Sequence, residues 1–215
     1  DEWDQISEAL LQHLQLTLTA VAIGVVISAL LTAMALRFRW SASPISGLTG
    51  VLYTVPSVAL FGLLVPYTGL SIWTAVIPLV AYTLLILVTN FVAGFRAVPA
   101  EVRDAAEGMG LSPTRRVLGV ELPIASPFII TGLRIATVST VGLVTVASII
   151  GQGGLGRLIL DGLRRTFWTP MVIGAVLSIV ALVSLVWAII EAPGKGWTSP
   201  EVLGAFALGA LTMAA

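Results

Sequence analysis

The fold is decided by a long stretch without any charged side chain, Trp40–Phe95, with the sequence WSASPISGLTGVLYTVPSVALFGLLVPYTGLSIWTAVIPLVAYTLLILVTNFVAGF. A helix rises about 1.5 Å per residue and needs roughly 20 apolar residues to cross a hydrocarbon core about 30 Å thick. The stretch is therefore long enough for two crossings. It divides at Pro66-Tyr-Thr-Gly-Leu-Ser71, a cluster typical of a tight turn between helices. We accordingly expect helices over 45–66 and 72–95.

Three further gaps between charges have spanning length. From Ala9 to Leu36 only His13 is ionisable, and Ile135–Gly156 and Thr166–Ile190 carry no charge. The gaps predict three more helices, over 10–36, 128–150 and 167–190, and so an all-α, polytopic membrane protein with about five spans. A soluble all-α domain is disfavoured because the chain is 57% hydrophobic and only 10% charged, against roughly 25% charged in soluble proteins.

The composition also excludes several kinds of site. Eleven basic residues balance eleven acidic ones, so no basic field is available for nucleic acid. With no cysteine and His13 as the single histidine, we expect no catalytic residues and no metal site. Gly151-Gln-Gly-Gly-Leu-Gly156 matches G-x-G-x-x-G but follows a predicted span, so we expect a tightly packed outer turn. Because no phosphate-binding P-loop motif occurs, any ATP must be hydrolysed by a partner chain.

The basic residues predict an orientation, since they concentrate in short cytoplasmic loops. Arg37 and Arg39 follow the first predicted span, and four arginines lie between the third and fourth, at 96, 103, 115 and 116. Three arginines, at 157, 164 and 165, oppose this arrangement. The larger group of arginines predicts a multi-pass protein of the plasma or inner membrane, with the N-terminus outside and the 96–127 loop in the cytoplasm.

That loop is the one long polar segment of the chain. Pro99 suits the first turn of a helix, and Gly110 stands where a helix would be capped. Ser112 is a candidate N-cap for a second short helix over 114–121. Two short helices joined by a glycine turn are thus expected to project from the membrane. They either meet a partner or form a solvated amphipathic connection.

The loop carries a spaced motif, Asp104-Ala105-Ala106, then Gly110 after three residues, then Val120-Glu121-Leu122-Pro123 after nine more. This pattern resembles the "EAA" loop of permease subunits from binding-protein-dependent ABC importers, with Asp104 in place of Glu and Val120 in place of Ile. Three flanking segments extend the resemblance: Thr54–Leu60, Gly132–Thr137 and Ile149–Gly156. Over roughly residues 10–190 the chain is most similar to the osmoprotectant type, for glycine betaine and choline, and more distantly to methionine-type permeases.

The resemblance implies a coupling helix that docks on a cytoplasmic ATPase subunit, where ATP and Mg²⁺ are bound, while this chain binds no cofactor. It also implies a second permease copy or paralogue, an extracytoplasmic solute-binding protein and alternating access. Leu122-Pro123 is expected to end the second short helix. The implied ATPase-coupling residues are Arg103, Asp104, Ala105, Ala106, Glu107, Gly110, Arg115, Leu122 and Pro123; Arg116 is expected to pair with charges on the ATPase.

The translocation path is expected along the second and third predicted helices, because Pro56, Pro66 and Pro78 interrupt them. Aromatic faces there suit a quaternary ammonium solute through cation–π contact. Asn90 either bonds a neighbouring helix or faces the path. The candidate path residues are Tyr53, Pro56, Ser57, Phe61, Tyr82 and Asn90. A stripe of small residues on the first helix predicts close helix packing: Ala20, Gly24, Ser28 and Thr32.

The end of the chain departs from the permease pattern. Residues 1–190 form the expected transmembrane domain, whereas 191–215 is an atypical tail or a partial sixth helix with a weak resemblance to drug:proton antiporters of the major facilitator type. Two other hypotheses therefore stay open: a fragment of a secondary transporter, and a non-transporting membrane scaffold whose loop recruits a soluble partner.

Overall fold

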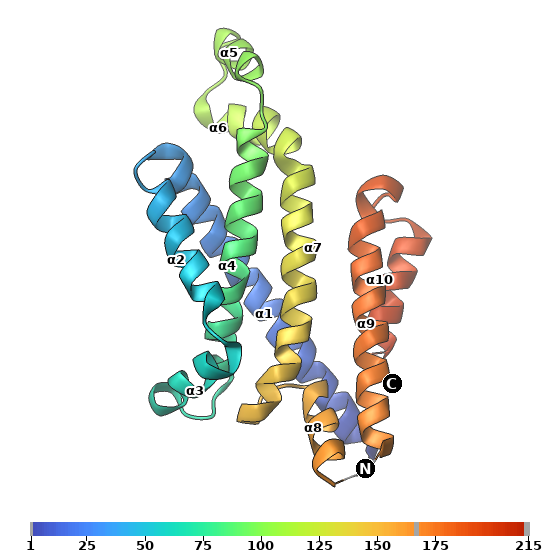
Figure 1. Cartoon of the computed structure of the whole chain (residues 1–215). Helices are drawn as coiled ribbons and strands as arrows, with labels where there is room; N and C mark the ends of the chain where they lie inside the picture. The colour runs from blue at the N-terminus through green and yellow to red at the C-terminus, as the bar shows by residue number, and fades with distance from the viewer. Residues whose placement is uncertain (1, 166–167, 213–215) are drawn as a thin grey trace.

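The computed structural model describes residues 2–165 and 168–212, and every element in that part of the chain is helical. Figure 1 shows long helices side by side, with short ones at both ends of the bundle. The elements, in chain order, are α1 Glu2–Arg37, α2 Ala42–Thr54, α3 Ser57–Thr68, α4 Ile72–Arg96, α5 Ala100–Gly108, α6 Pro113–Arg116, a π-helical turn Val117–Glu121, α7 Leu122–Val146, a 3₁₀ turn Ala147–Ile150, α8 Leu155–Arg165, α9 Trp168–Lys195 and α10 Pro200–Thr212.

Four of these helices are long and apolar enough to cross a membrane, and the bent pair α2–α3 would make a fifth span. They are α1, α4, the continuous run from α6 through α7, and α9. In Figure 1, α1 crosses behind α4 and α7, the α5–α6 loop lies at one end, and α3, α8 and the N-terminus lie at the other. The chain is therefore an all-helical, multi-pass membrane protein.

The second predicted helix, 45–66, is interrupted at Pro56, as expected, and forms two helices. α2 ends at Thr54 and α3 begins at Ser57, with their axes bent by 94°. Pro56 causes the break, since a proline disfavours helical geometry at the preceding residue, and Val55 is extended (φ −69°, ψ 129°). The hydroxyl of Tyr82 on α4 donates to the freed carbonyl of Val55.

Pro66 and Pro78 do not break their helices, contrary to expectation. Both lie inside a helix, α3 and α4 respectively. A proline removes one backbone hydrogen bond, which bends a helix without always ending it. In α4 the packed surroundings support Pro78, because it is buried in the bundle.

The small-residue stripe on α1 packs as expected. Ala20, Ser28 and Thr32 are all buried, and Gly24 lies against α4. A Cβ atom at Gly24 would stand 2.1 Å from the hydroxyl oxygen of Thr83, so the contact tolerates no side chain there. Close approach through small residues holds membrane helices together, since lipid is as apolar as their side chains.

Gly24→Val is expected to lower the free energy of unfolding by about 1–3 kcal/mol, because the added methyl groups push α1 away from α4. The measurement is the midpoint of unfolding in a detergent titration followed by circular dichroism. Gly47→Val is the control, since nothing lies within 4 Å of a Cβ built on that exposed helical glycine. Equal midpoints for the two variants would contradict a tight α1–α4 contact.

The glycine-rich turn at 151–156 packs tightly, as its sequence predicts. A Cβ at Gly154 would lie 2.5 Å from both the carbonyl of Ala9 and the Cβ of His13, and Gly154 has a φ of +50°. Gln12 donates to the side chain of Gln152 (2.9 Å) and accepts from the backbone of Gly154 (3.1 Å). Gln152 in turn donates to the carbonyl of Leu70 (3.1 Å). These bonds join α1, the turn before α8 and the α3–α4 connection at one end of the bundle.

The tail contains a helix of its own. α9 continues to Lys195, and α10 folds back along it over Pro200–Thr212, which Figure 1 shows as two neighbouring helices. Val202 of α10 is buried in one cluster with Ala188 and Ala192 of α9. At about 1.5 Å per residue, the 13 residues of α10 are too short to cross a bilayer.

Candidate coupling site

The polar loop projects beyond the ends of α4 and α7 as two short helices, α5 and α6 (Figure 1). α5 begins after Pro99, which serves as its N-cap instead of lying in its first turn. Glu101 lies in that first turn, where the positive end of the helix favours an acid. The helical hairpin expected from the sequence is thus present.

Gly110 closes α5 by a Schellman motif. Its amide donates to the carbonyl of Glu107 (2.9 Å), and the amide of Leu111 donates to that of Ala106 (3.2 Å). Gly110 has a φ of +73°, a left-handed conformation that is costly for other residues. No atom lies within 4 Å of a Cβ built there, so backbone conformation, and not space, requires the glycine.

The second helix does not end at Leu122-Pro123, which corrects the sequence expectation. From Pro113 the chain stays helical through α6, the π turn and α7 to Ile150. Within the π turn the amide of Leu122 donates to the carbonyl of Val117, five residues back. Pro123 then occupies the first turn of α7, where a helix tolerates a missing amide hydrogen. The π turn thereby admits the proline without a break.

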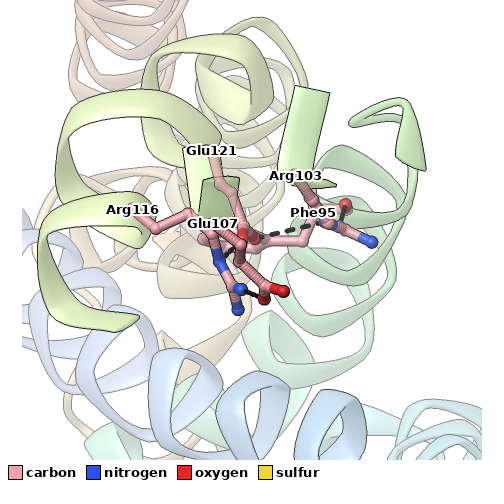
Figure 2. A network of polar contacts seen from close by, with 5 residues as sticks. All are labelled: Phe95, Arg103, Glu107, Arg116 and Glu121. Atoms are coloured by element: carbon pink, nitrogen blue, oxygen red, sulfur yellow. Dashed lines mark hydrogen bonds and ion pairs between the residues drawn. The ribbon is translucent and has the colours of Figure 1, made fainter. Parts of the chain in front are cut away.

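A buried carboxylate ties the two halves of the loop together, and Figure 2 shows this network. Glu121 is only 6% exposed. It accepts a hydrogen bond from Nε of Arg116 (2.8 Å) and pairs with Nε of Arg103 (3.6 Å). Arg116 also pairs with Glu107, and Arg103 donates to the carbonyl of Phe95 at the end of α4. α4, α5, α6 and the start of α7 are therefore fixed to one another.

The predicted coupling residues divide into an outer and an inner group. Asp104, Ala105, Gly110 and Arg115 are exposed. Ala106 is 1% exposed, so its side chain packs inside the loop. Five other residues remain. Arg103, Glu107 and Arg116 bond within the loop, while Leu122 and Pro123 are exposed at the start of α7.

Two residues of this loop were not among the predicted coupling residues. Glu121 is the centre of the ion network, and the signal for it was an isolated acid at the edge of the apolar run that follows. Met109 lies at the tip of the loop and is 72% exposed. A large apolar residue between two glycines of a polar loop was the signal for a contact surface.

The candidate path residues do not all lie together in the structure. Tyr53 and Tyr82 meet edge to face at the α2–α3 bend, with ring centroids 5.6 Å apart. Pro56 and Ser57 form that bend and the start of α3. Phe61, in contrast, is buried in the core beside Leu16 and Leu79.

Asn90 lies farther along α4, away from this bend. Its amide donates to the carbonyl of Ile86 in its own helix (2.8 Å), so the expected bond to a neighbouring helix is not the one it makes. A Cβ at Gly132 of α7 would lie 2.7 Å from the Cβ of Asn90, which shows close packing between the helices. Of the six candidates, only Tyr53, Tyr82, Pro56 and Ser57 thus lie together, at the α2–α3 bend.

A multi-pass helical bundle with a braced two-helix loop at one end fits a membrane transport subunit. Comparison with known proteins agrees: residues 14–192 match the model of the family described as "Binding-protein-dependent transport system inner membrane component". The chain belongs to this family. The match favours a permease subunit and gives no support to a fragment of a secondary transporter.

Two curated relatives share about a third of their residues with this chain. It is 34% identical over 181 residues to the osmoprotectant import permease protein OsmW of Salmonella typhimurium, covering 82% of this chain and 84% of the relative. It is also 34% identical over 153 residues to the choline transport system permease protein OpuBB of Bacillus subtilis, covering 71% and 70%. In fold it resembles the inward-facing MetNI methionine ABC transporter, with a TM-score of 0.69 at 20% identity, covering 91% of this chain and 94% of that one.

Proposed function

We propose that this chain pairs with a second permease copy or a paralogue to form the path for a quaternary-amine osmoprotectant such as glycine betaine or choline. A separate ATPase, which binds ATP and Mg²⁺, drives the transport, and an extracytoplasmic binding protein delivers the solute. The observation that carries the proposal is the braced loop, in which Glu121 joins α5 and α6 to the ends of two long helices. The names of the relatives support the solute class.

The loop is built to transmit movement. Its exposed residues include Ala105, with a small side chain, Asp104, Met109 and Arg115, and they form the proposed docking face. Arg103 links this face to Phe95 on α4, and Arg116 links it to the start of α7 through Glu121. A displacement of α5 by a partner therefore moves α4 and α7 with it, as alternating access requires.

The orientation belongs to the same proposal. Arg39 and Arg96 line one groove at the loop end of the bundle, near the end of α1. This basic end would face the cytoplasm, and the start of α1, next to α8, would face outward. The docking loop and the ATPase would then lie on the same side of the membrane.

The α2–α3 bend is the proposed place where the solute meets this chain. Tyr53 is 42% exposed, and its ring is held by the edge-to-face contact with Tyr82. An exposed aromatic face attracts a quaternary ammonium group, which has no hydrogen to donate from nitrogen. Pro56 keeps this face fixed by holding the bend.

The test is reconstitution of the chain with its ATPase subunit and binding protein in proteoliposomes. We expect uptake of radiolabelled choline when ATP is present. This uptake is expected to stay the same when ionophores remove all ion gradients. Tyr53→Leu is expected to lower uptake while leaving ATPase copurification intact. Uptake that needs an ion gradient and no ATPase would identify a secondary transporter, and a complex without any uptake would identify a scaffold; either result contradicts the proposal.

A further inference from the structure

A cavity of about 630 Å³ lies directly beneath the polar loop. Its lining comes from the second half of α1, the end of α4, the π turn and the start of α7. The volume falls within the roughly 300–1,000 Å³ of small-molecule sites in proteins. Nothing in the coupling proposal uses this space, so its chemistry can be considered separately.

Part of the cavity lining is apolar. Val25 and Ala29 of α1 form one wall, Phe91 and Phe95 of α4 another, and Ile129 of α7 a third. All of these helices are candidate membrane spans, so the cavity lies at the level of the membrane near its loop side. An apolar chain is the chemistry that fits such walls.

The cavity is also basic. Three arginines line it, Arg37, Arg103 and Arg116, against the single carboxylate of Glu121. Glu121 pairs with two of the three. Arg37 stacks on the ring of Phe38 and makes no ion pair among the residues that the structure describes. A positive charge therefore stays available at the cavity.

A buried hydroxyl also belongs to the lining. Thr32 lines the cavity, is 2% exposed and has no hydrogen-bond partner in the described part of the chain. It precedes Arg37 by five residues, or about 7.5 Å along the helix. A buried polar group without a partner is costly, so an acceptor oxygen at this depth would stabilise the site.

We propose that the cavity binds one anionic phospholipid from the leaflet on the side of the loop. The phosphate lies beside Arg37 and Arg103, an ester carbonyl accepts from Thr32, and one acyl chain fills the apolar part. Basic pockets between membrane helices bind acidic lipid head groups in this way. Free phosphate lacks the chain that the apolar walls require, and a zwitterionic lipid adds a positive group next to the arginines.

The site touches the network that braces the loop. A phosphate beside Arg103 meets the same guanidinium that pairs with Glu121 and donates to Phe95. Bound lipid therefore reduces the mutual repulsion of the arginines around Glu121. The lipid is expected to stabilise the loop as well as to fill the cavity.

The test is native mass spectrometry of the full chain, purified in detergent and mixed with equal amounts of palmitoyl-oleoyl phosphatidylglycerol and phosphatidylcholine. We expect preferential retention of one phosphatidylglycerol molecule. Ala29→Phe fills the apolar wall and is expected to abolish the preference, whereas Arg37→Gln lowers it about fivefold. Ala22→Phe, on the same helix outside the cavity, and Arg115→Gln, which removes an exposed loop charge, are the matched controls and keep it.

Three outcomes would overturn the proposal. Equal retention of the two lipids would show that the negative charge of phosphatidylglycerol is not recognised. Undiminished binding by Ala29→Phe, with helix content unchanged by circular dichroism, would place the lipid elsewhere. Protection of the loop from trypsin by inorganic phosphate alone, with no effect of phosphatidylglycerol vesicles, would identify a free-anion site.

Discussion

Gly110→Val is expected to lower ATP-driven solute uptake and transport-coupled ATPase activity more than about tenfold. A left-handed conformation costs a residue other than glycine roughly 1–2 kcal/mol, and a β-branched residue more, while about 1.4 kcal/mol already corresponds to a factor of ten. Gly110 has a φ of +73°, and two capping bonds depend on it. Valine is expected to open both bonds and turn α6 away from α5, so the docking face loses its shape. Both activities are measured in the reconstituted complex.

Two matched variants separate conformation from size. Gly110→Asn is expected to keep uptake within about twofold, since asparagine tolerates the left-handed region. Gly108→Val places the same side chain two residues earlier, at an exposed helical position with no atom within 4 Å of its Cβ, and is also expected to retain uptake. Normal uptake by Gly110→Val would show that the closed loop is not needed for coupling.

Glu121→Gln is expected to lower the free energy of local opening of the loop by about 3 kcal/mol. This value is at the lower end of the range for breaking a buried ion pair. The change leaves Arg103 and Arg116 without their shared countercharge, although both keep some contact with water. When local opening is fast, proteolysis follows the population of the open form. Trypsin cleavage at Arg115 should therefore be about a hundredfold faster than in the unchanged protein, and uptake should fall as well.

Glu107→Gln provides the control, because Glu107 pairs with the same Arg116 but its side chain is 61% exposed. An exposed ion pair contributes up to about 1 kcal/mol, so cleavage is expected to change less than about fivefold. Equal cleavage rates for the two variants would mean that the buried carboxylate does not brace the loop.

Much of the fold follows from the distribution of charges. The uncharged gaps located the long helices α1, α4, α7 and α9, because a membrane requires length and apolarity and little else. The break at Pro56 obeys a local rule and was placed correctly. Whether Pro66 and Pro78 also break their helices depends on packing from other helices, which a local rule does not contain.

The turn of the loop was predicted because local geometry decides it. The left-handed turn at Gly110 is required by the chain around it, and glycine is the residue for that conformation. The roles of Glu121 and Ala106 depend on how α5 folds against the π turn, a contact between segments about fifteen residues apart. Charged side chains such as Arg103 and Arg116 look alike in sequence whether they face a partner or a buried acid.

The π turn at 117–121 determines the direction in which the loop projects from α7. Each hydrogen bond in such a turn spans one residue more than in an α-helix, so the segment contains a surplus residue. With about 3.6 residues per α-helical turn, one residue corresponds to a rotation of roughly 100° about the axis. The azimuth at which α5 and α6 point from α7 is thus set by the number of residues in this turn, and a family member lacking the surplus residue would present the same docking face in another direction.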